Sequence, residues 1–142
     1  MVVDFGTSTN IDVVSARGEF LGGALAPGIE VSMEALAARA AALLTVELVP
    51  PRSVIGKNTV ECLQSGLLYG FTGQVAGLVN RILAELDQPA VVIGTGGLAP
   101  LMIGESQTIT EHVPELTLLG LRLVYLRNAP VSHRFGAKAT SE

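Results

Sequence analysis

The sequence predicts an α/β fold in which a three-stranded antiparallel meander is followed by helices and by a buried parallel strand. Three observations favour this fold class. Apolar segments separated by turn-forming residues begin the chain, and apolar side chains then recur at helical spacing over several later segments. A short, continuous apolar run near residue 90 is typical of a strand covered on both faces. The 142 residues correspond to about one domain of ordinary size.

The first 26 residues are expected to form the meander. Its three predicted strands are the apolar segments Met1–Phe5, Ile11–Ser15 and Phe20–Ala26. The polar residues Gly6–Asn10 would form the first connection and a tight turn at 16–19 the second, and Pro27-Gly28 would end the third strand.

Helical periodicity predicts the next elements. Residues 29–44 carry apolar side chains at helical spacing and two glutamates near the start, which favours a helix. Residues 46–49 are expected to form a short extended piece before Pro50-Pro51. Asn58 and Thr59 offer cap oxygens for a second helix toward Tyr69. Gly70 and Gly73 leave its continuation open, and helical spacing resumes over 74–86.

The remaining residues are expected to alternate between strands and helices. After Pro89, the predicted elements are a buried parallel strand at 90–93, a helix at 98–103, a short edge strand at 108–113 and a helix at 116–126. From Pro130 the periodicity is lost. We therefore expect one lobe over residues 1–128 and a flexible tail over 129–142.

Composition excludes several classes of function. Hydrophobic residues make up 49% of the chain and charged residues 15%, which excludes an intrinsically disordered protein. The net charge of −4, without a cluster of Lys and Arg, disfavours nucleic acid and anionic membranes as partners. No apolar stretch is long enough to span a bilayer, and the start lacks the basic region of a secretory signal. The single cysteine, Cys62, fits a reducing cytoplasm.

The first candidate site is Asp4 with the Gly6-Thr7-Ser8-Thr9 segment that follows it. A carboxylate at the end of a strand offers a ligand for a cation, and the adjacent turn offers backbone N–H groups for phosphate oxygens. The alternative is an ordinary hairpin loop whose Asp and Thr side chains satisfy local backbone donors. The pattern alone leaves both interpretations open.

The second candidate is the apolar run from Val91 that leads into Gly94-Thr95-Gly96-Gly97. Glycines at the carboxyl end of a strand let a nucleoside lie against the main chain, because no Cβ atoms intervene. A plain glycine-rich turn is the alternative. The segment is neither a Walker A loop nor a GxGxxG fingerprint.

The third candidate is Gly56-Lys57-Asn58-Thr59. The Thr59 hydroxyl could contact a polar substrate, or it could cap the helix that follows; Lys57 could bind phosphate or be solvated.

Other titratable residues receive no catalytic role. Cys62 is expected to be a small buried residue. His112 and His133 have no partner pattern, and Glu34, Glu61, Glu85 and Asp87 are expected on solvated helix faces.

Six segments, in this order, resemble the carboxyl-terminal half of type III pantothenate kinases. They are Asp4-Phe5-Gly6-Thr7-Ser8-Thr9, Ala26-Pro27-Gly28-Ile29, Ile55-Gly56-Lys57-Asn58-Thr59-Val60, Ser65-Gly66, Gly94-Thr95-Gly96-Gly97-Leu98-Ala99 and Leu116-Thr117-Leu118-Leu119-Gly120-Leu121. The resemblance extends to about Asn128.

The resemblance implies one ribonuclease-H-like lobe of the actin-like ATPase and sugar or acetate kinase superfamily, whose members bind ATP between two such lobes. The implied activity is transfer of the ATP γ-phosphate to pantothenate, the first step of coenzyme A synthesis, with Mg²⁺ and a monovalent cation, K⁺ or NH₄⁺. Asp4 would hold the monovalent cation, and Thr59 would contact pantothenate. Gly6, Thr7, Gly96 and Gly97 would bind ATP. The family's dimers imply a homodimer.

The sequence also departs from the family pattern. The family's Asp-x-Gly-Asn-Thr phosphate loop is absent, and so is the Gly-x-Asp-Arg segment whose aspartate is the general base. No catalytic residue is therefore assigned in this chain. Ala76 stands where many relatives have an acidic residue, which puts a helix contact at the dimer interface in doubt.

These departures predict a truncated or split kinase. The alternatives are a catalytically inactive nucleotide-binding or dimerisation module, and a decayed reading frame.

Overall fold

The computed structural model describes residues 1–40, 45–86 and 88–129. The expected tail from Pro130, the last residues of the helix expected over 29–44, and Asp87 lie outside the described residues.

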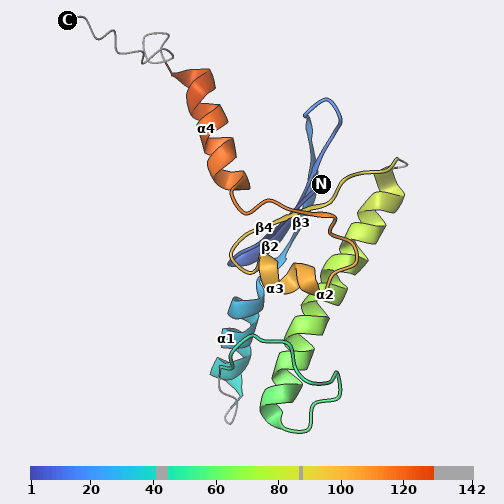
Figure 1. Ribbon diagram of the computed structural model, residues 1–142, viewed down its shortest axis with the longest axis vertical. Coiled ribbons are helices and arrows are strands. Elements are labelled where there is room, and N and C mark those ends of the chain that lie inside the picture. The colour runs from blue at the N-terminus through green and yellow to red at the C-terminus, as the bar shows by residue number, and fades with distance from the viewer. Residues whose placement is uncertain (41–44, 87, 130–142) are drawn as a thin grey trace, which may run out of the picture.

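A mixed sheet of five strands forms the centre of the molecule (Figure 1). The strands are β1 (Val2–Phe5), β2 (Ser8–Val14), β3 (Phe20–Pro27), β4 (Ile93–Thr95) and β5 (Glu111–His112). Their order is β3-β2-β1-β4-β5; β1 pairs antiparallel with β2, and β2 with β3, whereas β4 runs parallel to both β1 and β5. The helices are α1 (Ile29–Arg39), α2 (Thr59–Leu86), α3 (Ala99–Gly104) and α4 (Leu116–Asn128). The predicted α/β sheet with packed helices is confirmed.

The core lies between one face of the sheet and helices α2 and α3. Alternate residues of β1 and β2 are buried, as expected for strands with one covered face; they are Val3, Phe5, Ile11 and Val13. Leu68, Val75 and Val79 of α2 pack into the same cluster, as do Ala99 and Met102 of α3. The seven- and four-residue spacings in α2 place these side chains on one side of the helix.

Helix α2 runs without a break for 28 residues, so the interruption considered at Gly70 and Gly73 is absent. Glycine in a helix interior costs roughly 1 kcal/mol relative to alanine. The buried Leu68 and Val75 lie on either side of the two glycines and anchor both halves of the helix to the core. The Thr72 hydroxyl also donates to the Leu68 carbonyl at 2.9 Å within this segment.

Strand β4 (Ile93–Thr95) begins farther along the chain than the strand predicted at 90–93. Strand β4 starts at Ile93, because the Ile93 N–H donates to the Met1 carbonyl and starts the parallel ladder with β1. Val91 is 53% exposed and precedes the ladder. The expected short edge strand is found as β5, and the helix expected at 116–126 as α4. No helix in the described part of the chain is long and apolar enough to cross a membrane.

Candidate functional site

The first two sequence candidates meet at the carboxyl ends of β1 and β4. Asp4 is opposite Thr95 in the parallel ladder, so Gly96 follows directly beside Asp4. Gly96 has a φ of +94°, and a Cβ atom built there would collide with Asp4 Oδ1 and lie 2.5 Å from the Phe5 carbonyl oxygen. The Leu98 N–H donates to that carbonyl at 3.2 Å. Only glycine allows the Asp4 carboxylate to lie this close to the main chain.

The turn after β1 is shorter than predicted. Strand β2 begins at Ser8, so only Gly6 and Thr7 connect the two strands, and the Gly6 N–H donates to the Ser8 carbonyl at 3.1 Å. Thr7 is exposed at the tip of this turn. An exposed hydroxyl beside an open backbone turn can contact a phosphate group.

A third motif supports this turn from the other side. The Gly28 N–H donates to the Thr7 carbonyl at 3.0 Å, and α1 begins at the next residue. A Cβ atom on Gly28 would lie 2.5 Å from the Thr7 carbonyl oxygen. Segments around residues 6, 28 and 96, far apart in the sequence, thus form one site at this edge of the sheet.

A half-buried amide, that of Asn10, faces this site and was not among the sequence candidates. Asn10 is paired with Asp4 across the antiparallel ladder, so the two side chains lie on the same face of the sheet. Asn10 Oδ1 is buried and has no hydrogen-bond partner in the structure. Sequence reasoning placed Asn10 in a loop, and the only signal for a strand was the alternation of Thr9, Ile11 and Val13.

The oxygen atoms here suit a hard cation better than a soft transition metal. The Asp4 carboxylate and the orphaned Asn10 Oδ1 are hard oxygen donors. Within residues 1–40, 45–86 and 88–129, no group of three His, Cys, Asp or Glu side chains could hold a metal ion. A cation bound here would therefore depend on one carboxylate with amide and backbone oxygens.

Thr59 lies on a different part of the molecule. It is the exposed first residue of α2, and the amino end of α2 lies at the bottom of Figure 1, below the sheet. The described contacts do not join Thr59 to Asp4 or Gly96. Helix α1, which starts beside the Thr7 turn, contacts α2 and connects the two regions.

The capping alternative for Thr59 is wrong, because Asn58 caps α2. The Glu61 N–H donates to Asn58 Oδ1 at 2.9 Å. In return, Glu61 Oε2 accepts the Lys57 N–H at 2.9 Å, and Glu61 Oε1 lies 3.2 Å from the Arg52 guanidinium. This reciprocal pattern fixes the loop that precedes Thr59. The Glu61 side chain is only 16% exposed, so its assignment to a solvated helix face is also wrong.

Two further side chains of α2 bind the segment before it. The Ser65 hydroxyl donates to the Val54 carbonyl at 2.6 Å, and the Gln64 amide donates to the Glu47 carbonyl at 2.9 Å. Cys62 is exposed, which corrects the expectation that it is buried, because the first turn of α2 extends past the sheet. Its thiol lies 3.6 Å from the Gly56 carbonyl.

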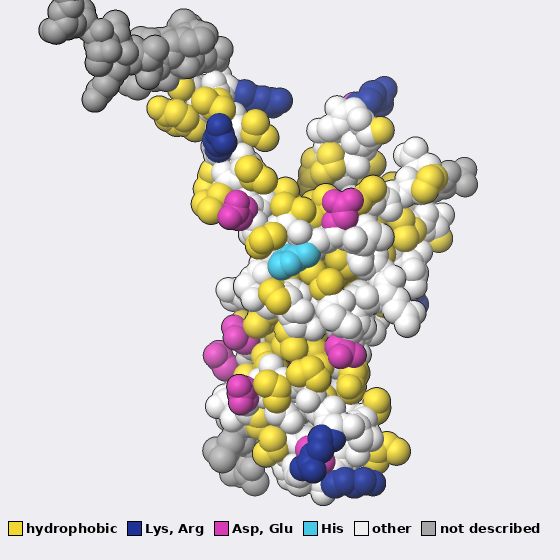
Figure 2. All heavy atoms as spheres, in the orientation of Figure 1, with side chains coloured by type: hydrophobic (Ala, Val, Ile, Leu, Met, Phe, Trp, Pro, Cys, Tyr) yellow, Lys and Arg dark blue, Asp and Glu magenta, His cyan; other side chains and the backbone are white. Residues whose placement is uncertain are grey.

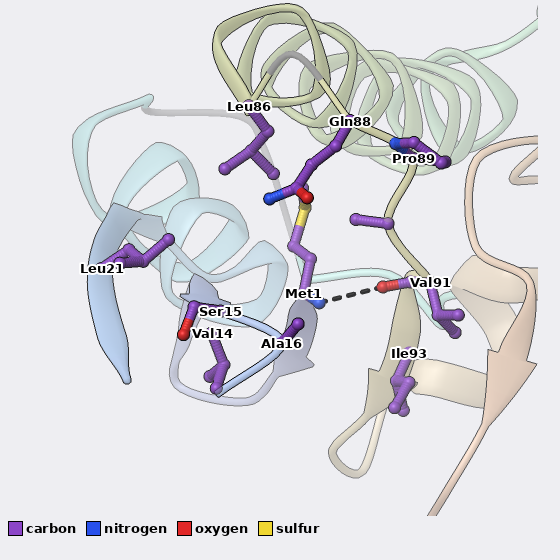
Figure 3. Close-up of a pocket in the computed structure, with 11 residues that line it drawn as sticks. Met1, Val14, Ser15, Ala16, Leu21, Leu86, Gln88, Pro89, Val91 and Ile93 are labelled. Atoms are coloured by element: carbon purple, nitrogen blue, oxygen red, sulfur yellow. Dashed lines mark hydrogen bonds between the residues drawn. The ribbon is translucent and has the colours of Figure 1, made fainter. Parts of the chain in front are cut away.

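A pocket of about 340 Å³ lies at the amino end of β1, away from Asp4 (Figure 3). Apolar side chains make up most of its wall, including Val14, Leu21 and Leu86. The Met1 amino group points to the Val91 carbonyl and donates to it at 2.9 Å. This pocket carries no group suited to catalysis, so we place the candidate site at the Asp4 edge.

The fold and the Asp4 edge define a class of protein. A mixed α/β sheet with glycine-rich turns at the carboxyl ends of adjacent strands is consistent with nucleotide-binding α/β proteins. Residues 1–81 match the family model of type III pantothenate kinase, and the chain belongs to that family.

Curated relatives support this membership. The chain is 74% identical over 132 residues to a type III pantothenate kinase from Saccharopolyspora erythraea, a match that covers 90% of this chain and 50% of the relative. A type III pantothenate kinase from Frankia alni is 67% identical over 128 residues, covering 90% of this chain and 51% of the relative. The chain thus spans about half the length of the curated relatives it matches.

A solved structure supports the fold alone. A Baf family protein from Campylobacter jejuni superposes with a TM-score of 0.58 at 22% identity, over 89% of this chain and 57% of that one.

Proposed function

We propose that this chain is half of a kinase that phosphorylates pantothenate to 4'-phosphopantothenate with ATP, the first step of coenzyme A synthesis. The observation that carries the proposal is the contact of the Asp4 carboxylate with Gly96, which joins two family motifs at adjacent strand ends. The identity to relatives named type III pantothenate kinase supports the same activity.

Each candidate residue has a role in this proposal. Gly6 and Thr7 bind the phosphates of ATP through the turn after β1, and Gly96 and Gly97 lie against the adenosine. Asp4 holds a monovalent cation, K⁺ or NH₄⁺, which supplies positive charge beside the ATP phosphates, while Mg²⁺ accompanies ATP. Thr59 donates its hydroxyl to pantothenate. The fold in this proposal is one ribonuclease-H-like lobe of a two-lobed kinase.

The chemistry requires positioning more than a strong nucleophile. The pantothenate hydroxyl oxygen forms a bond to the γ-phosphorus, the bond from that phosphorus to the β,γ-bridging oxygen breaks, and ADP leaves. The hydroxyl proton goes to the aspartate base, which the family resemblance puts in the half that this chain does not span. This chain orients the phosphates with backbone N–H groups, and the monovalent cation that Asp4 would hold would supply positive charge beside them.

We further propose that the kinase works in the cytoplasm as a homodimer. Its substrates are then ATP and pantothenate, with neither nucleic acid nor a membrane as partner. Ala76 on α2 is half-buried, and it replaces the acidic residue that many relatives carry.

Ligand binding with matched variants tests the roles of these residues. The assay uses a complex of this chain with the missing half of a relative. In that complex, Asp4→Asn should raise the K⁺ concentration needed for half-maximal activity by about 100-fold, the usual size of the effect of one lost charge-stabilising group. Thr59→Val should raise the KM for pantothenate and leave that for ATP unchanged. Glu85→Gln, at an exposed glutamate near the carboxyl end of α2, is the control. Equal constants for all three variants would contradict the assigned roles.

A catalytically inactive nucleotide-binding or dimerisation module is the second candidate. The separation of Thr59 from the Asp4 edge favours this candidate. The proposed ATP-binding residues of this lobe have no described contact with Thr59, the residue proposed to bind pantothenate. ATP binding without phosphate transfer, even in the presence of the other half, would support this candidate.

A further inference from the structure

Helix α4 has an apolar surface that nothing in the described part of the chain covers. None of its residues is buried, and Leu118, Leu121 and Leu123 are 67%, 61% and 61% exposed. Figure 1 shows the helix projecting from the body after β5, and Figure 2 shows apolar side chains over its visible face. An apolar surface of this kind on a monomer marks an interaction site.

The apolar residues of α4 occupy more than one side. Leu118, Leu121 and Tyr125 follow a three- and four-residue spacing and form one stripe, and Leu119, Leu123 and Leu126 form a second stripe. A helix with apolar side chains on more than one side is normally enclosed by other elements. A second copy of this helix would cover one stripe only, so a homodimeric helix pair would leave the other stripe in water.

The relatives indicate what encloses the helix. The match covers 90% of this chain and so leaves about 14 of its 142 residues unmatched. Helix α4 ends at Asn128, with 14 residues after it, so a continuous match of this length includes the helix. The same helix therefore occurs in proteins twice as long as the matched region. Those proteins thus carry an additional half that can cover the helix and that this chain does not span.

We propose that α4 is the docking element for the other half of the type III pantothenate kinase fold, which encloses both apolar stripes. The two stripes of α4 share no residue with the ligand-binding positions proposed at the Asp4 edge, so docking can be measured separately from ligand binding.

The test uses the full chain and, as partner, the part of the Saccharopolyspora erythraea relative outside the matched region. The two are co-expressed, purified through a tag on one of them, and analysed by sedimentation without ATP or pantothenate. A one-to-one complex is expected. Leu119→Asp and Leu121→Asp should each weaken it about 30-fold or more, the effect of losing a central interface residue.

Leu36→Asp is the matched control. Leu36 lies on helix α1 and is 44% exposed, the same fraction as Leu119. This variant should form the complex with unchanged affinity. Circular dichroism of each purified variant checks that the lobe is folded, and hydrogen exchange should show α4 amides protected only in the complex.

Three results would overturn the proposal. They are no complex on co-expression, equal affinity of the α4 and Leu36 variants, and self-association through α4 without partner binding. A complex that lacks kinase activity would contradict the proposed function alone, because docking is measured without substrates.

Discussion

Replacement of Gly96 by alanine should destabilise the lobe strongly. At a φ of +94°, alanine costs about 1–2 kcal/mol relative to glycine. Its Cβ would also collide with Asp4 Oδ1 and lie 2.5 Å from the Phe5 carbonyl oxygen, and such overpacking costs about 1–3 kcal/mol. The sum is about 2–5 kcal/mol, a large part of the roughly 5–15 kcal/mol that stabilises a domain.

The assay is urea unfolding followed by circular dichroism. Gly97→Ala is the control, because Gly97 has no positive φ and a Cβ atom there would meet nothing within 4 Å. Its free energy of unfolding should stay within about 0.5 kcal/mol of the wild type. Equal stability of the two variants would refute the close contact between β1 and the Gly96 turn.

Three further predictions concern other contacts. Gly28→Ala should lower the free energy of unfolding by about 1–3 kcal/mol, because its Cβ would lie 2.5 Å from the Thr7 carbonyl oxygen. Gly66→Ala, on an open helix surface, should raise it by about 0.5–1 kcal/mol, and urea titration compares the two variants. Glu61→Ala should speed proteolysis of residues 45–58 severalfold, because it removes the acceptor of the Lys57 N–H. Glu85→Ala, at an exposed position of the same helix, should be cleaved at the wild-type rate, and equal cleavage of the two variants would contradict this role of Glu61. Cys62 should react with a thiol reagent in the native state at nearly the rate seen in urea, and strong native protection would contradict its exposure.

The sequence predicted the order of elements because periodicity is local. It could not place the strand ends, because these depend on pairing between distant segments. Strand β2 starts at Ser8, not Ile11, since it pairs with β3 from Ser8 and with β1 from Thr9. That shift moves Asn10 from a loop to a position facing Asp4, which is why the amide was missed.

The environments of two neighbouring residues, Glu61 and Cys62, were predicted wrongly. Cys62 and Glu61 follow each other in the first turn of α2, yet the thiol is exposed and the carboxylate binds the preceding loop. Amino-acid type predicts the reverse, because cysteine is usually buried and glutamate usually solvated. The packing of the loop over α2, which depends on Gln64 and Ser65, decides between them.

The adjacency of Asp4 and Gly96 could be anticipated only in part. Both follow apolar runs, and the carboxyl ends of parallel strands share one edge of a sheet. The ladder between β1 and β4 makes these two strands neighbours. This pairing of distant segments cannot be predicted from local sequence patterns.

The central claim is that this chain is half of a pantothenate kinase. The most direct measurement is transfer of radioactive phosphate from γ-labelled ATP to pantothenate, with K⁺ and Mg²⁺ present. We predict labelled 4'-phosphopantothenate when this chain is combined with the missing half of a relative, and none from either piece alone. The complex with the Asp4→Asn variant should need about 100-fold more K⁺ to give the same label. A complex of the two pieces that binds ATP and transfers no phosphate to pantothenate would contradict it.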